Sequence, residues 1–193
     1  MKWPALILAS ASPRRAELLR ELEVRFAVEP SCATELDSDH LTAWELAQLN
    51  AHRKARSVAK QHPDALVLGA DTVVVLGTAL YGKPRDRKDA ARMLGELEGR
   101  THQVVTGVCL IHLREHRERL LAERTDVRFR PLSQADIERY LDRIDPLDKA
   151  GAYAIQEFGE LLVEEISGSY TNVVGLPVER LEAELRAWGD PAA

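Results

Sequence analysis

The feature that most constrains the fold is one long apolar stretch, residues 65–76, which reads Ala-Leu-Val-Leu-Gly-Ala-Asp-Thr-Val-Val-Val-Leu. Only Gly69, Asp71 and Thr72 interrupt it. A short apolar run rich in valine, bounded by a turn signal, is typical of a buried strand. Gly77-Thr78 supplies that turn, and residues 79–81 are expected to return as a second, short strand.

The segments on either side alternate between helical and strand-like patterns. Thr42-Ala43-Trp44-Glu45 is a capping box that opens a long helix, and Ser12 with Pro13 is typical of a helix start. We expect helices at 13–22, 43–60, 86–99, 133–141 and 177–188, and further strands at 5–9, 24–28, 101–113, 119–129, 151–156 and 160–167. This alternation predicts an α/β fold with a mixed parallel/antiparallel sheet and flanking helices. No linker rich in Pro, Gly or Ser divides the chain, so residues 1–193 are expected to form a single domain.

Composition narrows the functional classes. No apolar run approaches the ~20 residues that a membrane helix needs. The run Leu6-Ile7-Leu8-Ala9 is too short for a signal peptide, so a cytosolic protein with no membrane partner is expected. The net charge of -5 argues against nucleic acid as a partner, and a polyanionic ligand would need a local basic cluster. Cys32 and Cys109 fit no metal or redox spacing.

Asp71 is an unusual residue for its position. A carboxylate inside a buried strand is costly unless it has a partner or a purpose. It is either an aspartate at a strand end that accepts hydrogen bonds from loop amides, or a group that takes a proton from water or binds a divalent metal. The residues alone weigh these two interpretations about equally.

The segment Ser10-Ala11-Ser12-Pro13-Arg14-Arg15 joins an expected strand to an expected helix. Two arginines in the first turn of a helix oppose its dipole. The same position, with free N–H groups and two planar guanidiniums, suits an anion such as phosphate. An anion site is modestly favoured over a solvated helix start.

Two lysines are further candidates. Lys54 sits at the edge of the apolar stripe made by Trp44, Ala47, Ala51, Ala55 and Val58. It either extends to solvent along that face or points into a cleft. Lys83 lies between Gly82 and Pro84, which restrict the local backbone.

Taken together, four motifs resemble the Maf family of nucleotide pyrophosphatases. They are residues 8–15 (Leu-Ala-Ser-Ala-Ser-Pro-Arg-Arg), residues 69–74 with 82–85, residues 147–156 with their Gly-Ala-Tyr and Ile-Gln pairs, and residues 168–177. The motifs occur in the family's order and spacing and run from about Leu6 to Pro177.

This resemblance implies two lobes around a central cleft, a homodimer, a Mg²⁺ or Mn²⁺ cofactor, and hydrolysis of a nucleoside triphosphate between its α and β phosphates. The family's general base falls on Asp71, and Glu35 and Asp71 are the implied metal ligands. The implied phosphate-binding residues are Ser10, Arg15, Lys54 and Lys83, and the implied substrate-selecting residues are Arg14, Thr72 and Gln156.

The segment around Gln156 is similar to the family branch that acts on dTTP and UTP. Ala154 and Glu157 stand where that branch usually has glycine, which bears on base preference. Alternatives are a pyrophosphatase for 7-methyl-GTP or another non-standard nucleotide, and a non-enzymatic nucleotide-binding regulator of septum formation.

Overall fold

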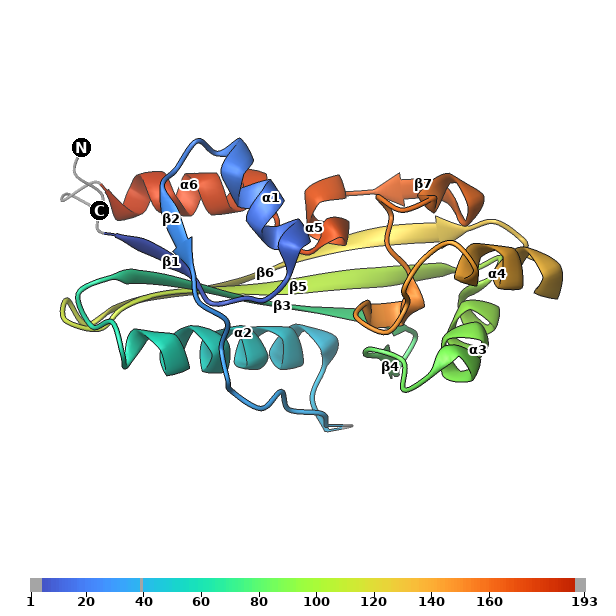
Figure 1. Ribbon diagram of the computed structural model, residues 1–193, viewed down its shortest axis with the longest axis horizontal. Coiled ribbons are helices and arrows are strands. Elements are labelled where there is room, and N and C mark those ends of the chain that lie inside the picture. Colours follow the sequence, from blue (N-terminus) through green and yellow to red (C-terminus); the bar gives the residue numbers. More distant parts are fainter. Residues whose placement is uncertain (1–4, 39, 190–193) are drawn as a thin grey trace. The chain divides into compact units, whose positions relative to one another are not determined.

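The computed structural model describes residues 5–38 and 40–189. Its elements in chain order are β1 (Leu6–Leu8), α1 (Pro13–Glu21), β2 (Phe26–Val28), α2 (Ala43–Ala59), β3 (Leu66–Leu76), β4 (Ala79–Tyr81), α3 (Arg87–Leu97), β5 (Thr101–His112), β6 (Arg117–Phe129), α4 (Gln134–Leu141), the 3₁₀ turns η1 (Ala150–Ala152) and η2 (Gly159–Leu161), β7 (Val163–Ser167), α5 (Tyr170–Val174) and α6 (Val178–Trp188) (Figure 1). None of the described helices combines the length and apolar character that crossing a bilayer requires.

The strands are hydrogen-bonded in the order β2-β1-β3-β5-β6-β7, and β4 pairs with β3 outside this path. β1 is parallel to both β2 and β3, with Leu6 opposite Phe26 and Leu66. β4 is antiparallel to β3, and β7 is antiparallel to β6. Helices α1 and α2 are the crossovers that parallel neighbours require. The predicted mixed sheet with flanking helices is therefore confirmed.

The chain divides into two compact units. The first contains the described residues of Met1–Asp71, Thr106–Glu123 and Gly175–Ala193, and the second contains Thr72–Val105 and Arg124–Val174. Strands β3, β5 and β6 each contribute residues to both units. The single domain expected for residues 1–193 stays a prediction.

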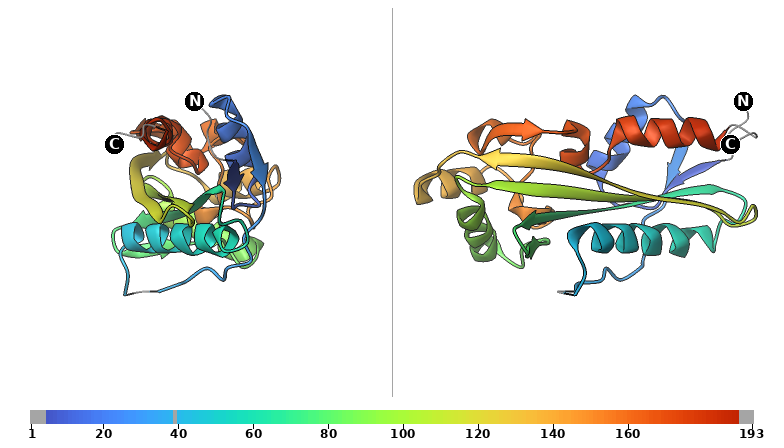
Figure 2. Two further views of the ribbon diagram at one scale, coloured as in Figure 1. Left: turned by 90° about the vertical axis from the view of Figure 1, so that its left-hand side faces the viewer. Right: turned by 180° about the vertical axis from the view of Figure 1, so that it is seen from behind.

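In the first unit, α2 lies on one face of the strands and α1 and α6 lie on the other (Figures 1 and 2). The predicted capping box starts α2, since Thr42 and Glu45 exchange side-chain-to-backbone hydrogen bonds. Glycines on the strands let the helix backbone come close. A Cβ added to Gly69 would lie 2.4 Å from the carbonyl oxygen of Ala51, and one added to Gly107 would lie 2.3 Å from that of Ala47. Small residues on both sides thus set a short distance between helix and strands.

The second unit has its own apolar core, to which β5, β6, α3 and α4 all contribute. Phe129 and Tyr140 are fully buried in it. The rings of His102, Phe129 and Tyr153 pack edge to face, with centroids 4.7–5.5 Å apart. His102 Nε2 and the Tyr153 hydroxyl are 2.9 Å apart and share a hydrogen bond. This unit carries motif residues 82–85, 147–156 and 168–174, whereas residues 175–177 belong to the first unit.

The strand predicted at 151–156 is wrong. Residues 150–152 form a 3₁₀ turn instead, and both Gly151 (φ 68) and Ala152 (φ 64) have left-handed backbone conformations, which a strand does not accept. The amide of Gly151 donates to the carbonyl of Gly82, which holds the turn against the segment after β4. The apolar character of the segment reflects burial, because Ala152, Tyr153 and Ala154 are all in the interior. The short helix α5 was not predicted.

Candidate active site

Three of the predicted residues lie where β1 leads into α1: Ser10 in the turn, and Arg14 and Arg15 at the start of the helix. Ser10 Oγ accepts hydrogen bonds from the amide of Ser12 (3.2 Å) and from Nη1 of Arg15 (3.3 Å). Arg15 Nε also donates to the carbonyl of Gly175 at 2.9 Å. Ser12 takes the N-cap position with an extended backbone and Pro13 begins the helix, which confirms the predicted helix start, although the Ser12 side chain makes no capping hydrogen bond. The amide of Ser12 donates to Ser10 Oγ instead, and the Arg15 guanidinium is held by both Ser10 and Gly175.

The charges at this turn favour an anion. Arg14 and Arg15 lie in the first turn of α1, which has no acidic residue. Burial lowers the pKa of the Arg15 guanidinium, the charge of Arg14 acts in the same direction, and the carboxylates of Asp71 and Glu35 oppose them. A guanidinium stays protonated in proteins despite such effects. A negatively charged group bound at this helix start would offset both the burial and the dipole.

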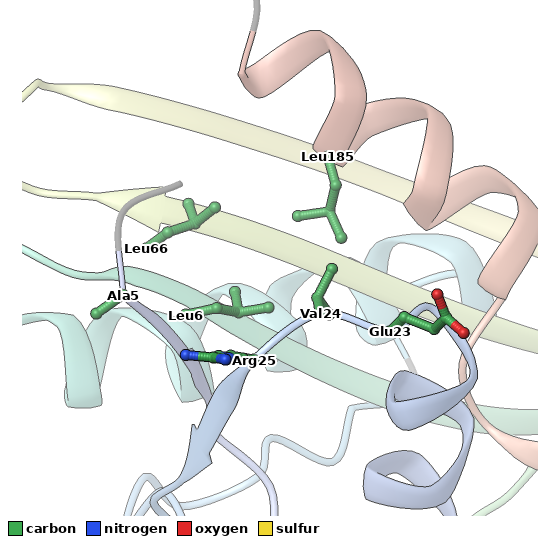
Figure 3. Close-up of a pocket in the computed structure, with 7 residues that line it drawn as sticks. All are labelled: Ala5, Leu6, Glu23, Val24, Arg25, Leu66 and Leu185. Carbon is green, nitrogen blue, oxygen red and sulfur yellow. The ribbon is translucent and has the colours of Figure 1, made fainter. Parts of the chain in front are cut away.

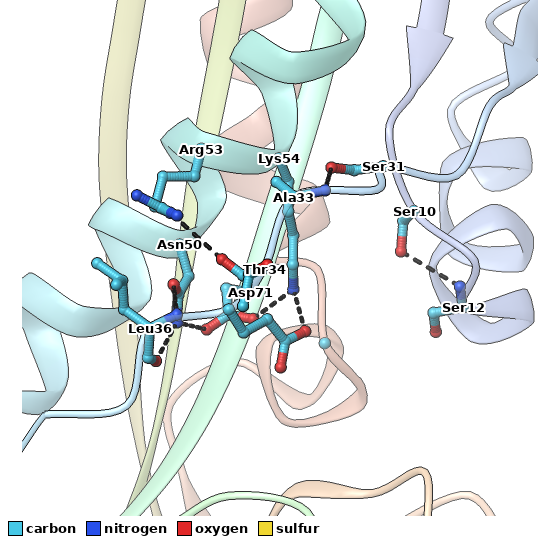
Figure 4. A network of polar contacts seen from close by, with 12 residues as sticks. Ser10, Ser12, Ser31, Ala33, Thr34, Leu36, Asn50, Arg53, Lys54 and Asp71 are labelled. Carbon is cyan, nitrogen blue, oxygen red and sulfur yellow. Dashed lines mark hydrogen bonds and ion pairs between the residues drawn. The ribbon is translucent and has the colours of Figure 1, made fainter.

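Asp71 lies on β3 in the same unit and is 7% exposed. Its Oδ1 forms an ion pair with Lys54 Nζ at 2.6 Å, and its Oδ2 accepts from Asn50 Nδ2 at 3.3 Å (Figure 4). Lys54 Nζ also pairs with Glu35 Oε1 at 2.7 Å. Of the two interpretations of Lys54, the structure therefore has the lysine pointing inward, between two carboxylates.

Asn50 is the residue that the sequence did not indicate. It lies one helical turn before Lys54 on the buried face of α2, where it is 3% exposed. The spacing from Ala47 and Ala51 puts it on the apolar stripe, so a polar residue in that register was the available signal. Trp44, which was assigned to the stripe, is instead 41% exposed. The buried face of α2 therefore includes Asn50 and excludes Trp44, unlike the predicted stripe.

The carboxylates of Glu35 and Asp71 are the predicted metal ligands. Among residues 5–38 and 40–189, no three His, Cys, Asp or Glu side chains gather closely enough to hold a metal ion by themselves. Mg²⁺ is usually held by one or two carboxylates together with substrate phosphates and water, whereas a cage made by protein alone is uncommon. Two carboxylates that already share one cation, the Lys54 ammonium, fit that kind of site.

The remaining predicted residues, Thr72, Lys83 and Gln156, belong to the second unit. Thr72 follows Asp71 directly on β3 and is half-buried, whereas Lys83 and Gln156 are exposed. The turn that carries Gln156 is anchored on both sides, as the contacts of its neighbours show.

On one side of Gln156, the hydroxyl of Tyr140 accepts from the amide of Ala154 (3.0 Å) and donates to its carbonyl (3.3 Å). On the other side, Glu157 Oε1 pairs with the buried Lys149 at 3.3 Å. The negative charge that Glu157 adds next to Gln156 is therefore offset within the second unit.

A pocket of about 340 Å³ in the first unit lies elsewhere (Figure 3). It is lined by Ala5, Leu6, Glu23, Val24, Arg25, Leu66 and Leu185. Leu6 and Leu66 begin β1 and β3, whereas Ser10 and Asp71 come after the parallel part of the same strands. Ligands of open α/β sheets bind at the carboxyl ends of strands, so Ser10 and Asp71 mark the better candidate for the active site.

Comparison with known proteins agrees with the motifs. Residues 5–188 match the sequence profile of the family described as Maf-like protein. The chain is 48% identical over 176 residues to the dTTP/UTP pyrophosphatase of Clostridioides difficile (91% of each chain) and 48% identical over 189 residues to that of Symbiobacterium thermophilum (96% of this chain, 95% of the relative). It is 49% identical over 176 residues to the Gloeobacter violaceus protein of the same name (91% and 92%).

A solved structure supports the fold alone. The HAM1 protein from Coxiella burnetii matches with a TM-score of 0.50 at 17% identity, over 95% of this chain and 99% of that one. The family match spans nearly all of the described residues and includes every motif discussed above. The chain is therefore a member of the Maf family.

Proposed function

We propose that this chain is a nucleoside triphosphate pyrophosphatase that hydrolyses dTTP and UTP to the monophosphate and pyrophosphate. The observation that carries the proposal is the buried Asp71 carboxylate, which is paired with Lys54 and acts electrostatically on Arg15 at the start of α1. The cations suit the binding of a polyphosphate, and the carboxylate is the group that can accept a proton from water. The name that the relatives carry, dTTP/UTP pyrophosphatase, supports this reaction and these substrates.

In this proposal Asp71 orients a water molecule and takes one of its protons as the water oxygen attacks the α-phosphorus. The bond between the α-phosphorus and the bridging oxygen breaks, and pyrophosphate leaves with that oxygen. Ser10, Arg15, Lys54 and Lys83 bind the phosphate oxygens. The positive charges of Arg15, Lys54 and Lys83 stabilise the negative charge that develops on the leaving group.

The proposal includes Mg²⁺ or Mn²⁺. Glu35 and Asp71 would hold the ion together with phosphate oxygens, and the bound ion would neutralise phosphate charge during the displacement. Because Lys54 bridges the same two carboxylates, at 2.7 and 2.6 Å, its ammonium has to shift toward the phosphates when the ion binds. Substrate and metal are therefore expected to bind together.

We assign nucleotide selection to Arg14, Thr72 and Gln156. The cytosolic location, the homodimer, and the absence of nucleic-acid and membrane partners belong to the same proposal. They rest on the family resemblance and the net charge of -5.

The test is product analysis after incubation with dTTP, UTP, CTP, GTP and 7-methyl-GTP, each with Mg²⁺ or Mn²⁺. Monophosphate plus pyrophosphate from dTTP and UTP is the expected result. Turnover of 7-methyl-GTP alone would contradict the assignment of Gln156, and diphosphate plus phosphate would contradict attack at the α-phosphorus. Nucleotide binding without turnover would favour the regulator of septum formation.

A further inference from the structure

Helix α2 brings a buried amide, Asn50, to the centre of the candidate site. Its Oδ1 accepts from the amide of Leu36 at 2.7 Å. Its Nδ2 donates to the carbonyl of Leu36 at 3.1 Å and to Asp71 Oδ2 at 3.3 Å (Figure 4). One side chain thus joins the loop after β2 to the carboxylate on β3.

These partners fix which way the amide points. The Leu36 N–H needs an acceptor, so the oxygen of Asn50 has to face it. The nitrogen then faces two acceptors, the Leu36 carbonyl and Asp71. The reverse orientation would set the Asn50 oxygen against a carbonyl and a carboxylate inside the protein, which is unfavourable. Asn50 is therefore a dedicated donor to Asp71.

We propose that Asn50 is a positioning residue for the metal-binding carboxylates. It holds Oδ2 of Asp71, while Lys54 holds Oδ1. It also grips both backbone groups of Leu36, the residue after Glu35, and so fixes the point from which the Glu35 side chain extends. Asn50 thereby sets the spacing between Glu35 and Asp71. This inference rests on the proposed function, because it assigns those carboxylates to one metal ion.

A simpler role for Asn50 is to anchor the loop after β2 without positioning Asp71. Arg53 on the same helix allows the two roles to be distinguished. Arg53 Nε donates to the carbonyl of Thr34 at 3.3 Å, and its side chain forms no hydrogen bond to Asp71 (Figure 4). Arg53→Ala removes one anchor from the same loop and leaves the donor to Asp71 in place. It is the matched control for Asn50.

The experiment compares Asn50→Leu, Asn50→Asp and Arg53→Ala with the wild type. Leucine keeps the branched arrangement of heavy atoms and removes every side-chain hydrogen bond. Aspartate keeps an acceptor for the Leu36 amide but replaces the donor to Asp71, and it serves if the leucine variant does not fold. Circular dichroism and thermal unfolding establish folding. The readouts are kcat and KM for dTTP, and Mn²⁺ affinity measured by electron paramagnetic resonance with the α,β-methylene analogue of dTTP.

We expect Asn50→Leu to lose about 10–100-fold in kcat and in Mn²⁺ affinity, as is typical when a partner of a metal ligand is removed. Asn50→Asp adds a carboxylate that can itself attract Mn²⁺, so it is judged on kcat, which should fall by a similar factor. At saturating metal, KM for dTTP should stay within about threefold in the Asn50 variants, because the proposal places Asn50 on the carboxylates and not on the nucleotide. Arg53→Ala should stay within about twofold in every readout, because its side chain bonds to Thr34 and not to Asp71. Folded Asn50→Leu with wild-type kcat and Mn²⁺ affinity, or folded Asn50→Asp with wild-type kcat, overturns the inference. So does an equal loss in Arg53→Ala.

Failure of the proposed function gives a different pattern. If the wild type hydrolyses no nucleotide, that function is wrong. The Mn²⁺ affinity of Asn50→Leu then still decides the role of Asn50, since it needs no turnover.

Discussion

Substituting Gly69 by alanine places a methyl carbon 2.4 Å from the carbonyl oxygen of Ala51 and 2.6 Å from the amide nitrogen of Ala55. Both atoms belong to the backbone of α2, so no side-chain rotation relieves the clash. Ordinary contact begins near 3.4 Å, and the helix therefore has to retreat from β3 by about 1 Å. Overpacking of this kind typically costs about 1–3 kcal/mol.

The displacement also changes the candidate site, because Asn50 and Lys54 belong to α2 and move with it. A misplacement of about 1 Å can lower the rate about 10²-fold. We expect Gly69→Ala to lower the unfolding midpoint by about 2–4 °C per kcal/mol lost and to reduce kcat strongly. Thermal unfolding and steady-state kinetics with dTTP measure the two effects.

Gly95→Ala is the control, since a Cβ there meets only the Ile137 side chain, at 3.9 Å. Gly95 lies inside α3, where alanine is favoured over glycine by about 1 kcal/mol. Its midpoint should rise or stay unchanged, with normal kcat. If Gly69→Ala keeps wild-type stability and turnover, the close approach of α2 to β3 is not what aligns the site.

Three further outcomes are expected. Asp71→Asn should lower kcat about 10²–10⁴-fold while circular dichroism stays native; near-normal turnover would remove Asp71 from the role of base. Tyr140→Phe leaves the buried amide and carbonyl of Ala154 without the hydroxyl, so urea unfolding should show a loss of about 1–3 kcal/mol, and an unchanged midpoint would contradict that clamp. Burial lowers the pKa of His102 from 6.5 to about 4. Between these values only the unfolded chain binds the proton, so stability should fall by about 1.4 kcal/mol per pH unit as the pH drops from 6.5 to 4. The free energy of unfolding in urea, measured between pH 7 and pH 4.5, should show this slope for the wild type relative to the His102→Gln variant. The same pH dependence in both proteins would refute it.

Local chemistry made much of the fold predictable. Two expected helix starts, Thr42 and Ser133, both carry capping boxes, and the apolar run ending at Leu76 is the strand β3. These features depend on residues that are close in sequence. These features therefore do not depend on contacts with distant parts of the chain.

The features that the sequence did not predict depend on contacts between residues that are distant in sequence. Residues 151–154 are apolar because they are buried, and a distant carbonyl, that of Gly82, holds Gly151 in a turn. Asn50 contacts Leu36 and Asp71, which are 14 and 21 positions away. No local pattern encodes either contact. The partnership of Lys54 with Glu35 was likewise open until the fold brought the loop to the helix.

The discontinuity of the first unit has a consequence for synthesis. Its first segment ends at Asp71, and its last begins at Gly175, roughly 100 residues later. At ~5–20 residues per second, a ribosome needs on the order of 5–20 s to cover that interval. During it, the carbonyl of Gly175 that holds Arg15 does not yet exist. The nascent chain therefore carries the arginine and aspartate of the candidate site early, but it completes their surroundings only with its last helix.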